Sequence, residues 1–341
     1  MYLSDKLPDP SGLEQRAIVD LLLREEYGYL PARPYRVSAS LESEDKKFCA
    51  GKASLKKLIL RCQAEWGEFS FPIYYVCPLY TDAPVPCFIH INFRSLIPDK
   101  YQPTEELVDS GYAVLTFCYL DVTSDSADFT DGLAGVIYPD GERKSDACGK
   151  IGLWAWAASA VMDYAVTLPE LDRHKISVAG HSRLGKTALL AGALDERFYC
   201  AFSNNSGCSG AALARGADGE TVKAITDKFP YWFCENYLKY SGKEDTMPFD
   251  QHYLIAANAA HRVYVASAEG DLWATPQNEY LACVAASDYY KSQGLRGFVH
   301  PARLPYAGEC MHEGDIGYHL RSGVHYLSRE DWLCYIKYLN N

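Results

Sequence analysis

The stretch that decides the fold covers residues 176–186 and reads Ile-Ser-Val-Ala-Gly-His-Ser-Arg-Leu-Gly-Lys. A short apolar run comes first, then Gly180 and Ser182, and then a helix-forming segment. Small residues beside a serine are typical of a tight turn, in which larger side chains have no room. The following helix would point its N-terminus at Ser182, and its free N–H groups would stabilise negative charge developing there. The pattern predicts a serine held out at the end of a buried strand.

Two interpretations of this turn remain open from the motif alone. Leu184 stands where the second glycine of a Gly-x-Ser-x-Gly nucleophile turn would fall. An ordinary serine in a strand–turn–helix connection fits equally well, because such short motifs recur by chance. A serine is also a poor nucleophile without a base and an orienting carboxylate, so the rest of the sequence has to supply both.

Outward from this turn, short continuous apolar runs alternate with helical patterns. Such runs are typical of strands covered on both faces, and their alternation with helices indicates a mainly parallel sheet. We therefore expect the α/β class, with an α/β-hydrolase fold built as a three-layer αβα sandwich. The chain is expected to form one domain over 1–341, with residues 1–50 as an N-terminal helix and a lead-in segment packed on it. The expected strands cover 58–62, 71–77, 87–91, 113–117, 176–179, 200–202, 263–266 and 316–320, and the expected helices include 154–166 and 186–194.

The first expected helix has recognisable ends. Ser11 and Glu14 have the spacing of a capping box, and Ile18 and Leu22 contribute to an apolar face. Pro31 and the proline at position 34 are expected to end the helix.

Composition excludes several classes of function. The net charge is −11 with no run of Lys or Arg, which argues against nucleic-acid binding. No apolar run approaches 18 residues, so no membrane span is expected. The start at Met1 has no basic segment followed by an apolar one, which favours a cytoplasmic protein unless a leader was removed. The 12 cysteines form no Cys-x-x-Cys pair, so we expect no metal and mostly buried thiols, with one or two disulfides left open.

Candidates for the acid and the base follow the last two expected strands, in the chain order Ser–Asp–His that α/β-hydrolases use. Asp271 lies deeper than Glu269 in the loop after 263–266, so we take Asp271 as the acid and Glu269 as the reserve. His325 follows a glycine at the exit of the last strand, where a base could approach the serine. His319 is expected inside that strand as a hydrogen-bonded core residue, and His312 has a weaker claim as a loop histidine. Each of these residues taken alone is more often structural.

Several further motifs resemble the glucuronoyl esterases, carbohydrate esterase family 15, in their bacterial branch, and the resemblance covers about residues 85–335. The similar segments are Gly-Tyr-Ala-Val at 111–114, Trp-Ala-Trp at 154–156, His-Ser-Arg-Leu-Gly-Lys at 181–186, Asn-Ser-Gly-Cys-Ser-Gly-Ala-Ala at 205–212, Phe-Pro-Tyr-Trp-Phe at 229–233, Asp-Gln-His at 250–252, Asp-Leu-Trp at 271–273 and Gly-Tyr-His at 317–319.

The resemblance implies hydrolysis of esters between (4-O-methyl-)glucuronic acid on xylan and lignin alcohols, without any cofactor. It implies that Ser182 is the nucleophile, that His325 is the base and that Arg183 helps to bind the oxyanion. The sugar contacts that it implies are Lys186, Glu220 and Trp273.

One departure from the family bears on the acid. Many members carry a glutamate just before the Ser-Gly of residues 206–207, where this chain has Asn205, which cannot serve as the acid. Some bacterial members instead have an acid at the position of Asp271. The missing leader is a second departure, and it favours small glucuronate esters or oligosaccharides as partners.

Two alternatives to a glucuronoyl esterase remain. One is a deacetylase of acetylated sugars, such as acetyl xylan, that uses the same three residues. The other is an inactive carbohydrate-binding relative. The charged residues Arg183, Lys186 and Glu220 favour a uronoyl group over acetyl, and an intact Ser182–Asp271–His325 set argues against inactivity. The sequence does not fix the oligomeric state.

Overall fold

The computed structural model describes residues 7–341, and in this range ten strands form one sheet. The start of the chain, on which the expected lack of a leader rests, lies outside the described residues. The strand order is β1-β2-β3-β5-β4-β6-β7-β8-β10-β9. The strands are β1 Arg36–Lys47, β2 Ala53–Ala64, β3 Gly67–Pro78, β4 Val85–Asn92, β5 Ala113–Cys118, β6 Leu171–His181, β7 Cys200–Asn204, β8 Arg262–Ala268, β9 Glu309–Met311 and β10 Ile316–Arg321.

The centre of this sheet is parallel and its two margins are antiparallel. Strands β5, β4, β6, β7, β8 and β10 run parallel in that order. Strands β1, β2 and β3 pair antiparallel on one side, and β9 pairs antiparallel with β10 on the other. The predicted mainly parallel sheet is therefore confirmed. Its C-terminal strand ends meet at one edge, where open α/β sheets bind their ligands.

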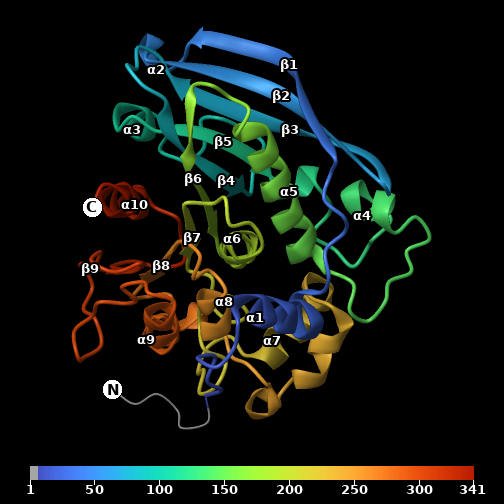
Figure 1. The fold of residues 1–341 in the computed structure, drawn as a ribbon, viewed down its shortest axis with the longest axis vertical. Helices are drawn as coiled ribbons and strands as arrows, with labels where there is room; N and C mark the ends of the chain where they lie inside the picture. Colours follow the sequence, from blue (N-terminus) through green and yellow to red (C-terminus); the bar gives the residue numbers. More distant parts are fainter. Residues whose placement is uncertain (1–6) are drawn as a thin grey trace.

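Helices cover both faces of the sheet. Figure 1 shows α3 and α10 on one side and α5 and α6 on the other. Successive strand residues divide between two apolar clusters: Phe88 packs with the α10 residues Trp332 and Tyr335, whereas Ile89 packs on the opposite face. The helices are α1 Gln15–Leu22, α2 Phe48–Gly51, α3 Thr104–Asp109, α4 Gly132–Ile137, α5 Lys150–Ala165, α6 Arg183–Leu194, α7 Val222–Lys228, α8 His252–Ala256, α9 Pro276–Ser292 and α10 Arg329–Leu339.

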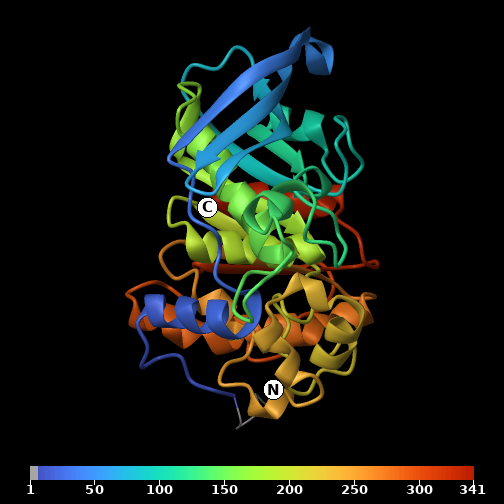
Figure 2. The same ribbon diagram turned by 90° about the vertical axis from the view of Figure 1, so that its right-hand side faces the viewer.

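The N-terminal fifty residues differ from the sequence prediction in three respects. Strand β1 was not predicted, and it extends the sheet through the hairpin at the top of Figure 2, with most of its residues exposed. The capping box is also wrong, because α1 begins after Glu14 without a side-chain cap, and Ser11 bonds to Asp9 instead. The helix continues into a π-helical turn and ends at Gly28, whose φ is 84°, before the prolines.

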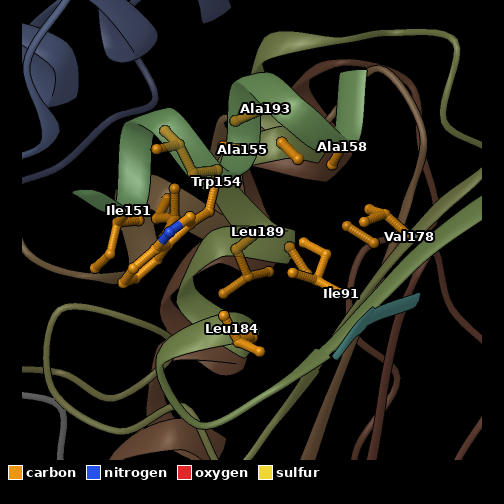
Figure 3. Packing of buried hydrophobic residues seen from close by; sticks show 14 of the residues in the cluster. Ile91, Ile151, Trp154, Ala155, Ala158, Val178, Leu184, Leu189 and Ala193 are labelled. Carbon is orange, nitrogen blue, oxygen red and sulfur yellow. The ribbon is translucent and has the colours of Figure 1, made fainter. Parts of the chain in front are cut away.

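The core beside the central strands positions the serine turn. Leu184 and Leu189 of α6 pack between strand residues such as Ile91 and the apolar face of α5, which includes Trp154 (Figure 3). Because α5 is apolar around most of its circumference, it is buried along its length and provides a rigid support for α6. Within residues 7–341, no helix has both the length and the apolar character that crossing a bilayer needs.

Candidate active site

Ser182 sits on a strained turn between β6 and α6. Its φ of 59° and ψ of −127° lie in a region that non-glycine residues rarely adopt. Gly180 permits the turn, because a Cβ at that position would lie 2.0 Å from the Leu184 carbonyl oxygen. Gly185 has the role that the missing second glycine would have, since a Cβ there would come within 3.1–3.2 Å of Asn204 at the end of β7 and of Ser206 in the loop after it. Leu184 is buried, and it anchors the turn in the core.

The first N–H groups of α6 are the backbone donors nearest to Ser182 in sequence. The Ser182 N–H is used, because it donates to the Asn204 carbonyl at 2.8 Å. Arg183 is the first residue of α6, so its N–H has no acceptor one turn earlier in the helix. That N–H is the backbone group suited to an oxyanion formed at Ser182.

His325 and Asp271 are brought together by the loops after β10 and β8. The Gly270 N–H donates to the Gly323 carbonyl at 2.8 Å, which joins the two loops. His325 Nδ1 then lies 2.6 Å from Asp271 Oδ2. Burial opposes ionisation of Asp271, but hydrogen bonds from His325 and Asn205 hold the pKa of its carboxyl below the usual value. The acid thus stays charged, and it fixes the imidazole with Nε2 as the free nitrogen.

Asn205 contacts the acid in place of acting as one. Its Nδ2 donates to Asp271 Oδ2 at 2.8 Å, the same oxygen that faces His325. Asn205 itself has φ 46°, and its N–H donates to the Ala266 carbonyl of β8 at 2.7 Å. The residue that differs from many family members therefore helps to position the carboxylate, a function that the sequence did not predict.

The other candidates for acid and base lie elsewhere. Glu269 is exposed and directs only its backbone N–H to Arg321. His319 is buried between Asp331 and the Tyr264 hydroxyl, at 2.9 Å from each, as expected of a core histidine. His312 bonds to the same hydroxyl at 2.7 Å. None of the three contributes to the cavity around Ser182.

A fourth histidine, His181, packs against the proposed base His325. The ring centroids of His181 and His325 are 4.5 Å apart, and His181 Nδ1 lies 2.6 Å from Asn204 Oδ1. Burial, reinforced by repulsion from His325, lowers the pKa of His181 to about 3. His181 therefore stays neutral at pH 7 and supports the imidazole by ring contact.

Arg183 is held by a partner that sequence reasoning missed. Its guanidinium forms an ion pair with Asp125, and it also lies over the Trp232 ring at 4.6 Å. The Trp232 Nε1–H donates to the other oxygen of Asp125 at 2.7 Å, and the Tyr231 hydroxyl donates to its carbonyl at 3.1 Å. Asp125 lies in a long Asp- and Ser-rich loop, where nothing in the sequence separates it from its acidic neighbours.

Lys186, Glu220 and Trp273 form one wall of the site, joined by an ion pair and a hydrogen bond. Lys186 is only 3% exposed, and its ammonium donates to the carbonyls of Ser206 and Cys208. It also lies 3.7 Å from Glu220, which accepts a hydrogen bond from Trp273 Nε1 at 3.2 Å. Two of the three Lys186 donors are thus bound to the protein, and Glu220 and the half-exposed Trp273 are left as the more accessible groups.

All seven residues expected from the sequence line a single cavity of about 370 Å³ at the C-terminal edge of the sheet. They are joined there by residues that were not predicted as site residues, among them Asn205, Phe229 and Trp232. The expected lining residues are Ser182, Arg183, Lys186, Glu220, Asp271, Trp273 and His325.

Comparisons with known proteins find similarity to carbohydrate esterases. A family model described as "Glucuronyl esterase, fungi" matches residues 61–294. The carbohydrate esterase MZ0003, from an unknown prokaryotic organism, is 40% identical over 250 residues, which are 73% of this chain and 57% of that protein. A 4-O-methyl-glucuronoyl methylesterase of Hypocrea jecorina (strain QM6a) is 27% identical over 322 residues, 91% of this chain and 64% of that one.

A solved structure shares the fold over nearly the whole chain. It is that of a promiscuous CE15 esterase from a marine bacterial metagenome, with a TM-score of 0.86 and 29% identity over 99% of this chain and 96% of that one. The expected α/β-hydrolase class is thereby confirmed. The chain spans only 57% and 64% of the length of the two curated relatives described above.

Proposed function

The chain belongs to the glucuronoyl esterase family, carbohydrate esterase family 15, and on that premise we propose that it hydrolyses esters of glucuronic acid through an acyl-enzyme on Ser182. The observation that carries the proposal is the meeting of Ser182, a His325–Asp271 pair and a charged, hydrogen-bonded wall in one cavity. The curated relative from Hypocrea jecorina bears the name of a 4-O-methyl-glucuronoyl methylesterase, which suggests the same class of ester here.

Acylation begins at His325. Its Nδ1 faces Asp271, so Nε2 takes the proton from the Ser182 hydroxyl as Oγ attacks the C6 carbonyl of the uronate ester. The ionised Asp271 stabilises the imidazolium that forms. When the tetrahedral intermediate collapses, the same Nε2 gives its proton to the departing alcohol. A water molecule, deprotonated in turn by His325, then attacks the acyl-enzyme and releases glucuronate and free Ser182.

The negative charge of the tetrahedral intermediate develops beside the N-terminus of α6. The Arg183 N–H and the guanidinium of the same residue are the donors for the oxyanion. Asp125 holds this guanidinium beside the Trp232 ring, so the cation is oriented before substrate arrives. Such preorganised donors are worth more in a partly closed site than in water.

The sugar ring is placed against the opposite wall. Glu220 can accept hydrogen bonds from ring hydroxyls, and Trp273 offers an exposed aromatic face beside it. Lys186 acts chiefly by fixing Glu220 and the 206–208 loop, because two of its donors already serve that loop. An acetyl group would make no contact with this wall, so we favour a glucuronoyl esterase over a deacetylase.

The test compares ester classes in the same enzyme. Hydrolysis of methyl or benzyl glucuronate should exceed hydrolysis of acetylated xylo-oligosaccharides, with Ser182→Ala as the control for any background activity. Loss of the nucleophile of such a triad typically reduces turnover by about a million-fold. Near-normal turnover in Ser182→Ala would refute the mechanism, whereas a preference for acetyl esters would refute only the proposed substrate.

A further inference from the structure

Two cysteines at the far margin of the sheet form a pair that the proposed hydrolysis does not use. Cys310 lies on the edge strand β9 and is exposed, and Cys334 lies on α10 and is half-buried. Their sulfur atoms are 3.8 Å apart. A disulfide has about 2.05 Å between its sulfurs, so the two side chains must move closer together for the bond to form.

The surroundings of this pair favour reaction at one of the two sulfurs. Cys310 lines a cavity of about 520 Å³ whose charged or titratable side chains include the basic His312, Arg303 and Lys337 and the carboxylates Glu309 and Glu313. Arg303 is paired with Glu309 at 2.6 Å. Hydrogen bonds from Cys334 and His312 lower the pKa of the Cys310 thiol, whereas the contact with Cys310 raises the pKa of Cys334. A thiol of lowered pKa beside a thiol of raised pKa is the arrangement of an attacking and a resolving cysteine.

The remaining thiols differ from this pair. Nine are buried, and where a shift is resolved burial raises the pKa, as for Cys62 and Cys148. Cys49 is half-buried, and burial raises its pKa too. Cys310 is therefore the thiol that a reagent in solution should reach first.

We propose that Cys310 and Cys334 are a redox-active dithiol that closes to a disulfide between β9 and α10. With a small disulfide such as oxidised glutathione as the oxidant, the Cys310 thiolate attacks one sulfur, which forms a mixed disulfide and releases one glutathione thiolate. Cys334 then loses its proton, attacks the Cys310 sulfur and releases the second glutathione. The protein loses two protons and two electrons in total, and one oxidised glutathione becomes two reduced molecules.

The cross-link would enclose the segment that carries the proposed catalytic base. Residues 310–334 contain β10 and the loop with His325, and the disulfide would tie both ends of that segment together. A loop of this length is in the range in which a disulfide stabilises by restricting the unfolded chain. We expect oxidation to raise Tm by roughly 5 °C and to slow the thermal loss of esterase activity.

The experiment incubates the native wild type with oxidised glutathione and follows intact mass and non-reducing peptide maps. Wild type should lose two hydrogens and yield a linked pair of peptides containing Cys310 and Cys334. Cys334→Ser should instead gain one glutathione at Cys310, because the resolving thiol is missing. Cys310→Ser should react far more slowly than either, and the matched control Cys49→Ser should behave as wild type.

Three results would overturn the proposal. They are a wild type that retains glutathione without closing, a linkage through another cysteine, and a Cys310→Ser variant that reacts as fast as Cys334→Ser. Oxidised and reduced wild type with equal Tm would overturn the inferred stabilisation of the His325 segment. Because the mass measurements do not involve ester hydrolysis, these outcomes are independent of the proposed function.

Discussion

Replacing Asp271 by asparagine should remove most of the activity while leaving the turn at Ser182 intact. Asp271 Oδ2 lies 2.6 Å from His325 Nδ1, which places the centres of the two charges about 4 Å apart when the imidazole is protonated. With an effective dielectric constant of about 20, that attraction is worth about 4 kcal/mol, or roughly a thousand-fold in rate. Loss of the tautomer that the carboxylate imposes extends the expected decrease in kcat toward ten-thousand-fold.

The assay is steady-state hydrolysis of benzyl glucuronate by purified variants, with circular dichroism to check the fold. Two variants are matched controls. Glu269→Gln changes an exposed carboxyl two residues from Asp271 and should keep near wild-type kcat. Asn205→Ala removes one neutral donor to the ionised Asp271 and should cost about ten-fold, the usual value of a hydrogen bond to a charged group.

Two outcomes would contradict this reasoning. If Asp271→Asn retained turnover within about ten-fold of wild type, the 2.6 Å contact would not be the catalytic pair. If Glu269→Gln were the more severe change, the acid would be the exposed neighbour, and the loops would have to rearrange when substrate binds.

Further variants test the walls of the cavity and the buried acid behind it. Glu220→Gln should lower kcat/KM on glucuronate esters by about ten- to a hundred-fold but leave hydrolysis of a small activated acetate unchanged. Lys186→Ala should lower both activities, because it also releases the 206–208 loop. Equal losses on the two substrates in Glu220→Gln would argue against a sugar contact. Asp125→Asn should lower kcat by about ten-fold through a less ordered Arg183, and unchanged kcat would remove the orienting role. Burial raises the pKa of the Glu279 carboxyl, on α9, to about 7, which is above its value in the unfolded chain. Its favourable contribution to the free energy of unfolding is therefore complete below about pH 4.5 and is lost as the pH rises through 7. Urea unfolding should therefore find Glu279→Gln more stable than wild type at pH 8, by roughly 3 kcal/mol, and a difference that does not grow from pH 5 to pH 8 would contradict the buried charge.

Local patterns in the sequence predicted much of the fold and of the site. Continuous apolar runs predicted the central strands because a parallel sheet buries both faces of each strand. The turn at Ser182 could be predicted because steric contacts restrict which residues fit beside a serine with positive φ. The resemblance to a known family then added Arg183 and Glu220, which no local pattern distinguishes from surface residues.

The exposed edge of the sheet escaped prediction for a physical reason. Only the first half of β1 alternates apolar and polar residues, at Val37, Ala39 and Leu41, whereas residues 42–47 are all polar and exposed. That pattern is too short to identify a twelve-residue strand, and antiparallel pairing with β2 extends it to Lys47.

The sequence by itself determined the serine turn, the order of its catalytic candidates along the chain and the kind of sheet that carries them, because each depends on neighbouring residues. Only the tertiary structure decided which acid faces His325, that Asn205 bonds to that acid, that Asp125 holds Arg183 and that Cys310 lies beside Cys334. These contacts join residues from separate loops and elements. Their distances follow from strand order and helix placement, which no short stretch of sequence encodes.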